Sequence, residues 1–140
     1  MSARPPRLKP AAVTRAKRDW RVALGGKSRR QGHRSEWLAA AWLMLKGYQL
    51  LSFRLKTRSG EIDILARRGR VLAVVEVTHR ASLDAALEAV TQTQRERLRR
   101  AGRAIAARRP SLQNLAVRLD LIALAPGRWP MHSPDAWKGG

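Results

Sequence analysis

The sequence has 140 residues, which fits a single domain and leaves little material for a second hydrophobic core. Lysine and arginine number 29 against 10 aspartates and glutamates, so the formal net charge is +19 at pH 7. This excess favours a polyanionic partner, and the 44% of hydrophobic residues excludes a chain that is disordered throughout. Because the chain has no cysteine, disulfides, thiolate nucleophiles and cysteine-based zinc sites are also excluded.

Composition divides the chain into three segments. Residues 1–30 are rich in arginine, lysine and proline and hold one acid, Asp19, which predicts a basic arm that is disordered on its own. Residues 31–125 carry periodic apolar patterns and form the expected domain, and residues 126–140 are a tail without an assigned element. No apolar run approaches the ~20 residues that a membrane span requires, so no membrane contact is expected.

The first expected element is a buried helix from Ser35 to Gly47. Trp37, Ala41 and Leu45 recur at helical spacing, and Gly47 is suited to the C-terminal cap. Three strands follow at residues 48–55, 61–67 and 71–78, the last two joined by a tight turn at Arg68 and Gly69.

The second half of the chain is expected to be a helical stretch followed by one strand. The helix begins near Ser82, breaks or bends near Val90 and Thr91, and continues to Ala107 before a proline. Residues 115–124 form the strand, which we expect to be parallel to a neighbour because a long helix precedes it. The resulting order is α-β-β-β-α-β.

Two of the scarce acids lie inside expected buried strands. Glu76 interrupts a run that is apolar on both faces, and Asp63 poses the same problem one strand earlier. A lone buried carboxylate is costly, so it protonates, pairs with a base or binds a metal. A metal site at Asp63 and Glu76 and a buried ion pair with an arginine are therefore the alternatives.

The predicted register brings these acids together. With Arg68 and Gly69 as a two-residue loop, Asp63 pairs with Val74, and Asp63, Glu76 and Thr78 point to the same face. The two carboxylates are then diagonal neighbours with backbones roughly 7 to 8 Å apart, a spacing that suits Mg²⁺. Glu61, at the mouth of its strand, either joins this face or is solvated.

Glu36 is a candidate for a third oxygen ligand. It lies in the first turn of the expected helix, on one stripe with Ala40 and Leu43, which would turn it toward the sheet. The alternative is that Glu36 only complements the positive end of the helix dipole.

The acidic segments resemble those of a known family. Residues 59–66 read Ser-Gly-Glu-Ile-Asp-Ile-Leu-Ala and residues 74–77 read Val-Val-Glu-Val, which resembles the signature of the YraN family of bacterial proteins. Residues 32–36, 46–48 and 118–120 resemble its opening helix, first strand and closing strand. The resemblance covers residues 32–124. It implies an α/β, restriction-endonuclease-like mixed sheet flanked by helices and a cytoplasmic bacterial protein.

The same resemblance implies a metal-dependent nuclease site of the PD-(D/E)xK kind. The family pattern places Glu36, Asp63 and Glu76 as the acidic triad that binds Mg²⁺ or Mn²⁺, with a lysine two residues after the strand glutamate. Here that position is Thr78, whose hydroxyl can orient a water but carries no positive charge. Lys56, Arg80 and Arg95 are candidates to supply the charge, whereas alternation aims His79 at the opposite face.

Three readings of the altered motif remain open. The chain is a weak or degenerate Mg²⁺-dependent endonuclease with Thr78 in a hydrogen-bonding role, a non-catalytic DNA- or RNA-binding accessory protein, or a fold that keeps its acids only for folding. Branched or single-stranded nucleic acid is the expected partner, and a homodimer formed through an apolar surface is a further expectation.

Arginines crowd the helix over residues 95–109, where Glu96 is almost the only counter-charge. Guanidinium groups contact phosphates in bidentate fashion, so the nucleic-acid backbone is the expected anion and sequence readout is expected to be slight. The residues predicted to bind it are Arg95, Arg99, Arg100 and Arg103 of this helix, with Lys56 and Arg58.

Overall fold

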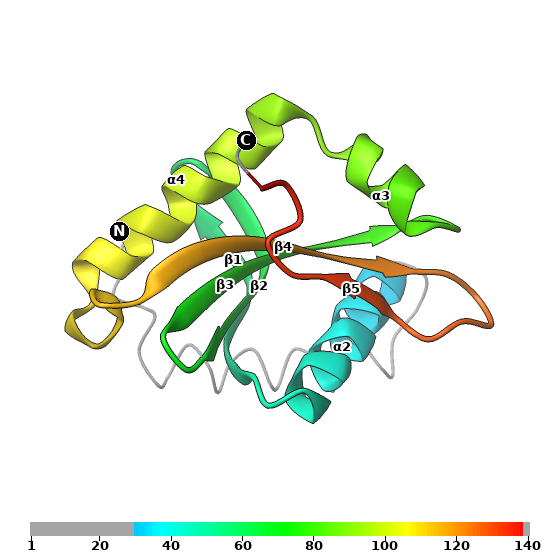
Figure 1. Ribbon diagram of the computed structural model, residues 1–140, viewed down its shortest axis with the longest axis horizontal. Helices are drawn as coiled ribbons and strands as arrows, with labels where there is room; N and C mark the ends of the chain where they lie inside the picture. Colours follow the sequence, from blue (N-terminus) through cyan, green and yellow to red (C-terminus); the bar gives the residue numbers. More distant parts are fainter. Residues whose placement is uncertain (1–29, 139–140) are drawn as a thin grey trace.

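The computed structural model describes residues 30–138. Within them, a five-stranded mixed sheet has the strand order β1-β2-β3-β4-β5 (Figure 1). The strands are β1 Gln49–Thr57, β2 Gly60–Arg68, β3 Val71–His79, β4 Ala116–Leu124 and β5 Met131–Ser133. The helices are α2 Arg30–Leu45, α3 Leu83–Ala89, α4 Gln92–Arg108 and the 3₁₀ helix η2 Pro110–Leu112. The basic arm predicted for residues 1–30 lies outside the described residues, apart from Arg30.

The expected α/β class is confirmed. Strands β3 and β4 are parallel, as predicted from the helix between them, and the other neighbouring pairs are antiparallel. Helix α2 covers one face of the sheet, and α3 and α4 cover the other (Figure 1). This mixed sheet between helices is compatible with the restriction-endonuclease-like fold.

Strand β3 is buried on both faces because its side chains alternate between the two helical layers. Ala73 and Val75 pack with residues of α2, whereas Leu72 and Val74 pack against Leu98 and other residues of α4. All four β3 side chains are fully buried. The continuous apolar run of this strand is thus explained by two covering layers.

The buried stripe of α2 differs from the prediction. Ala39, Ala40 and Leu43 form it, whereas Leu45 is 80% exposed and Leu38 is 50% exposed. From Trp37 to Leu45 every residue of the helix is apolar, so periodicity alone could not select the buried face. Gly47, with φ of +92°, follows the last turn, and its predicted role at the helix end is confirmed.

The β2–β3 turn is shifted from its predicted position. Arg68 pairs with Val71, so the loop consists of Gly69 and Arg70 and not of Arg68 and Gly69. Gly69 has φ of +59°, and glycine at the first loop position is typical of a type II′ hairpin. The register moves by two residues, which keeps every side chain on its expected face.

The helical region is divided where the sequence suggested. Val90 ends α3, and the Thr91 hydroxyl accepts a hydrogen bond from the Gln94 N–H at 3.1 Å at the start of α4. Ser82 caps α3 in the same way through the Ala85 N–H. Each helix therefore has its own N-cap, and α4 starts close to the C-terminal end of β3.

The tail contains a strand that the sequence did not reveal. Strand β5 pairs with β4 in antiparallel fashion, and Trp137 beyond it packs between α3 and α4 residues and donates from Nε1 to the Leu87 carbonyl at 3.2 Å. Three residues are too short for a detectable alternation. In the described part of the chain, no helix has both the length and the apolar character needed to cross a membrane.

Candidate functional site

Three acids from three different elements approach one another. Glu36 comes from α2, Asp63 from β2 and Glu76 from β3. The side chain of Glu36 is 15% exposed, and it shares its helix stripe with the fully buried Ala40 and Leu43. The Glu36 side chain therefore turns toward the sheet, which is one of the two alternatives that the sequence left open.

The carboxyl groups of Asp63 and Glu76 lie close enough to shift each other's pKa. Continuing the ladder from the pair of Ile64 and Val75 sets them directly opposite, and not diagonally as predicted. Asp63 Oδ2 also accepts a hydrogen bond from the Val77 N–H at 2.9 Å. The Asp63 carboxylate thus accepts the hydrogen bond of a β3 N–H at the point where the backbone pairing of β2 with β3 ends.

Burial and mutual repulsion hold protons on this cluster. Burial, followed by the charge of Asp63, raises the pKa of Glu36 and that of Glu76 to about 8 each. Burial raises the pKa of Asp63 as well, against the lowering effect of the Val77 N–H. Acids that cannot all ionise together need either a proton or a cation between them.

Two polar neighbours of the cluster were not identified as site residues from the sequence. Gln94 Nε2 donates to Glu76 Oε2 at 3.1 Å from the first turn of α4. Arg54 Nε lies 4.0 Å from Glu36 Oε1 and 3.5 Å from Glu61 Oε2, so Glu61 joins the rim of the cluster. The positive φ of Arg54, +50°, is rare for a non-glycine residue, and nothing in the local sequence announces it.

Two features support the fit of a divalent cation at this cluster: the carboxylate oxygens themselves and the buried, unpartnered hydroxyl of Thr78. Carboxylate oxygens are the ligands that Mg²⁺ prefers, and one or two protein carboxylates with waters are enough. The Thr78 Oγ1 is buried and has no hydrogen-bond partner, although an unpaired buried hydroxyl costs roughly 1–3 kcal/mol. Among the described residues, no three acids or histidines stand at the spacing of a formed metal site.

The three cations proposed to replace the motif lysine lie in different settings. Arg80 donates to the His79 carbonyl at 2.7 Å, and Arg95 lies over the ring of Trp137 with 5.5 Å between the guanidinium carbon and the ring centroid. Lys56 is exposed on β1. Arg54, which was not proposed from the sequence, is the cation that the structure places against Glu36 and Glu61.

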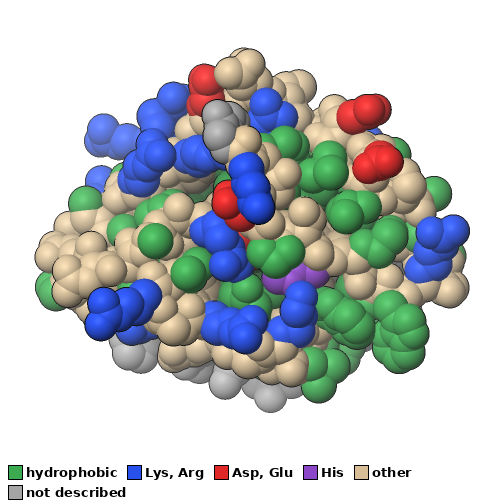
Figure 2. All heavy atoms as spheres, viewed as in Figure 1, with side chains coloured by type: hydrophobic (Ala, Val, Ile, Leu, Met, Phe, Trp, Pro, Cys, Tyr) green, Lys and Arg blue, Asp and Glu red, His purple; other side chains and the backbone are tan. Residues whose placement is uncertain are grey.

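The predicted nucleic-acid contacts divide into two groups. Arg100 and Arg103 are exposed on α4, and Lys56 and Arg58 are exposed on and after β1. Arg95 and Arg99 are partly buried against the tail, where Arg99 Nη2 donates to the Trp137 carbonyl at 2.9 Å. Figure 2 shows lysine and arginine side chains gathered over α4.

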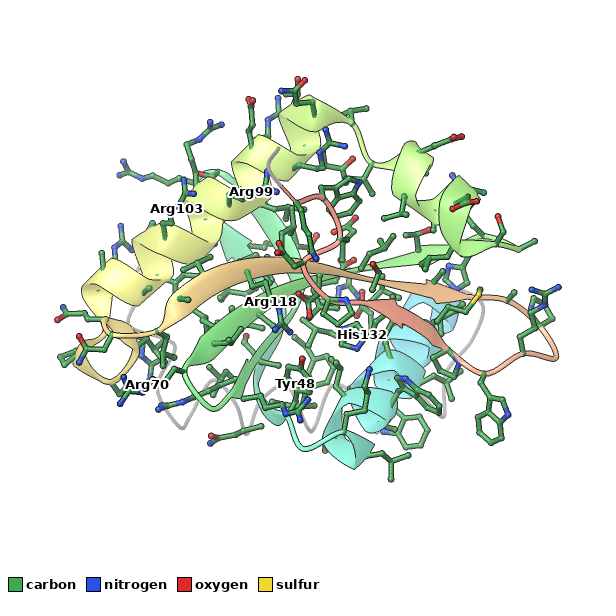
Figure 3. All side chains as sticks on the ribbon, in the orientation of Figure 1. Tyr48, Arg70, Arg99, Arg103, Arg118 and His132 are labelled. Carbon is green, nitrogen blue, oxygen red and sulfur yellow. The ribbon has the colours of Figure 1, made fainter. Side chains whose placement is uncertain are left out.

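A buried aspartate on β4, Asp120, is a further polar residue to which the sequence pattern assigned no role. Asp120 is fully buried and accepts from Arg118 Nε at 2.7 Å and from the Asp135 N–H at 3.0 Å. His132 Nε2 lies 2.9 Å from it, and Figure 3 shows Arg118, His132 and Tyr48 grouped together. Burial raises the pKa of Asp120, but the hydrogen bonds from His132 and Arg118 outweigh burial and lower it. The contact between His132 on β5 and Asp120 on β4 ties these two strands together.

Comparisons with known proteins find close relatives. A model of the family described as "Uncharacterised protein family UPF0102" matches residues 35–124. A UPF0102 protein of Caulobacter vibrioides is 60% identical over 119 residues, covering 85% of this chain and 95% of the relative. A UPF0102 protein of Caulobacter sp. strain K31 is 64% identical over 115 residues (82% of this chain, 83% of the relative). One from Paramagnetospirillum magneticum is 49% identical over 115 residues (79% and 89%).

Proposed function

Because the chain belongs to the uncharacterised protein family UPF0102, the YraN family that its motifs resemble, we propose that it binds nucleic acid and hydrolyses phosphodiester bonds with a divalent metal. The observation that carries the proposal is the meeting of Glu36, Asp63 and Glu76 from three elements in a chain of net charge +19. The acids can bind a divalent cation, and the basic chain around them attracts the phosphate on which that cation would act.

Each side chain has a role in this proposal. Asp63 and Glu76 would hold Mg²⁺ or Mn²⁺, with Glu36 bound directly or through a water. A divalent ion there would lower the pKa of a bound water for in-line attack on phosphorus. The Thr78 hydroxyl would be placed to orient an attacking water, and Arg54 would offer positive charge to the phosphate in place of the motif lysine.

The exposed cations supply the binding surface of the proposed enzyme. Arg100 and Arg103 on α4, with Lys56 and Arg58, contact backbone phosphates of DNA or RNA. The substrate is branched or single-stranded nucleic acid, recognised by charge and shape with little base readout.

The test combines metal binding with cleavage. We expect Mn²⁺ to bind by calorimetry and purified protein to cut labelled single-stranded or branched substrates with Mg²⁺ or Mn²⁺. Asp63→Ala removes both, whereas Asp84→Ala, at an exposed position of α3, retains both. Cleavage that survives Asp63→Ala would refute the site.

A non-catalytic nucleic-acid-binding protein is the second candidate, and two observations favour it. Thr78 stands where the family pattern has lysine, and Gln94 already donates a hydrogen bond to Glu76. This candidate predicts salt-sensitive binding that is indifferent to Mg²⁺ and to Asp63→Ala. Binding or cutting that depends on the metal would exclude it.

A further inference from the structure

A pocket of about 480 Å³ lies at the β2–β3 turn, away from the carboxylates. Its lining residues are Arg67, Arg70, Ser111, Asn114 and Leu115. Glu76 is five residues beyond Val71, the first residue of β3, so the pocket and the acids are separated by roughly 17 Å along the strand. One phosphate group therefore cannot contact both places.

Hydrogen bonds fix the walls of this pocket. Arg67 donates from Nε to the Gly69 carbonyl at 3.3 Å and from Nη1 to the Ser111 carbonyl at 3.4 Å, which joins the β2–β3 turn to η2. The Ala116 N–H donates to the Arg70 carbonyl at 2.8 Å and joins the same turn to β4. Figure 3 shows Arg70 beside the segment that leads from α4 into β4. The two guanidinium groups are thus carried by a braced backbone.

Both walls come from stretches of sequence without acids. Residues 64–75 supply Arg67 and Arg70, and residues 97–119 supply the other wall, and neither stretch contains aspartate or glutamate. The polar residues of the lining are two arginines, a serine and an asparagine. Positive charge with neutral hydrogen-bond donors and no competing carboxylate is the chemistry that selects an anion.

We propose that this pocket binds a phosphate group. Arginine matches phosphate geometry with two parallel N–H donors, and the exposed Arg70 provides the outer contact while Arg67 forms the braced inner wall. A volume of about 480 Å³ lies within the range of small-molecule sites, so the pocket admits a phosphate together with an attached sugar. The site goes beyond the proposed function and does not depend on the acids.

The first experiment uses inorganic phosphate and the full chain. Binding is measured by calorimetry for wild type, Arg70→Gln and Asn114→Asp, the last of which puts a carboxylate in the lining. We expect each variant to weaken binding at least about tenfold. Arg97→Gln and Gln92→Glu make the same charge changes at exposed positions of α4 outside the lining and should leave binding unchanged.

Two results would overturn the proposal. One is the lack of saturable phosphate binding by the wild type, and the other is an equal loss in lining and control variants, which would indicate general charge screening. Asp63→Ala should bind phosphate like the wild type, so failure of the metal site and failure of this pocket are distinguishable. Melting curves of each variant confirm that it is folded.

Further titrations distinguish a terminal phosphate from an internal phosphate as the group that the pocket binds. Adenosine monophosphate and two oligonucleotides, with and without a 5′-phosphate, are titrated against wild type and Arg70→Gln. Selective loss of monophosphate and 5′-phosphorylated strand assigns a terminal phosphate, and equal loss for both strands assigns an internal one. If Arg70→Gln changes none of these affinities, the pocket has no role in binding phosphate.

Discussion

Glu36, Asp63 and Glu76 are three buried or half-buried carboxyl groups in a strongly basic chain. Burial and mutual proximity raise the pKa values of Glu36 and Glu76 to about 8, against ordinary values of 4.5. Net charge alone would lower both values, so local burial has the greater effect. If the proposed metal binds here, it has to displace these protons, and affinity for Mn²⁺ should therefore rise with pH up to about 8.

The same shifts predict how stability depends on pH without metal. A carboxyl whose pKa is higher in the folded state binds more protons when folded, so unfolding becomes easier as pH rises from about 4.5 to about 8. Glu76→Gln removes one such group and keeps the acceptor for Gln94. We expect a higher melting temperature at about pH 8 and a smaller decline with pH.

Thermal denaturation from about pH 5 to about pH 9 checks this expectation. Glu88→Gln, at an exposed position of α3, is the control and should reproduce the wild-type decline. If Glu76→Gln declines as steeply as the wild type, Glu76 is not protonated in the folded protein.

Thr78 is the position at which catalytic power would be recovered. Thr78→Lys adds a positive charge beside Glu76 on β3, and one well-placed group is worth roughly 10²-fold or more in rate. We expect Mg²⁺-dependent cleavage to rise at least about tenfold over wild type in a single-turnover assay. Thr93→Lys, exposed on α4, adds the same charge elsewhere and should leave the rate unchanged. Equal rates for both variants would contradict this role.

Alternation along the strands was enough to predict that Asp63 and Glu76 share a face, because the side-chain period of two survives a two-residue register error. That the two acids lie directly opposite each other follows only from the observed loop at Gly69 and Arg70. Gln94 comes near these acids only through the docking of α4 on the sheet. Arg54 comes near them through the pairing of β1 with β2, in which its neighbours Phe53 and Leu55 pair with Ile64 and Ile62.

The packing of α4 on the sheet depends on a glycine that the helical pattern did not explain. A Cβ at Gly102 would lie 2.6 Å from Val74 Cγ2 and 3.0 Å from Val117 Cγ1. Helix propensity favours alanine over glycine by about 1 kcal/mol, whereas overpacking a tight core costs about 1–3 kcal/mol. The close approach of α4 to β3 and β4 therefore explains why position 102 is a glycine.

We expect Gly102→Ala to lower the free energy of unfolding by about 1–2 kcal/mol in urea denaturation. In a Val74→Ala background, the nearer of the two methyl groups that the new Cβ meets is gone, so the same change should cost less. An exposed position inside the helix gives a reference for propensity alone, because Ala104→Gly should cost about 0.5–1 kcal/mol. A cost for Gly102→Ala that is unchanged by Val74→Ala would place the strain elsewhere.

Net charge is a property of the whole molecule. Its effect on nucleic-acid binding depends on which arginines are exposed at the surface. Arg95 and Arg99 contact Trp137, whereas Arg100 and Arg103 are exposed. If the latter bind backbone phosphates, Arg100→Gln and Arg103→Gln should each reduce the slope of log affinity against log salt by about 1.

Fluorescence anisotropy with a labelled single strand over a series of KCl concentrations measures this slope. Arg128→Gln, in the exposed segment before β5, should lower the slope far less because it lies away from α4. A slope that depends only on the number of arginines removed would indicate diffuse attraction without a defined binding face.

By itself the sequence determined the alternation of buried strands, the helix boundaries at Gly47 and Thr91, and the common face of the acids, because each follows from local periodicity or capping. Only the tertiary structure decided the buried face of α2, the added strand β5, and the joining of Asp120 to His132. These depend on contacts between residues distant in the chain, whose energies come from exclusion of water and from shared hydrogen bonds, and no local pattern encodes them.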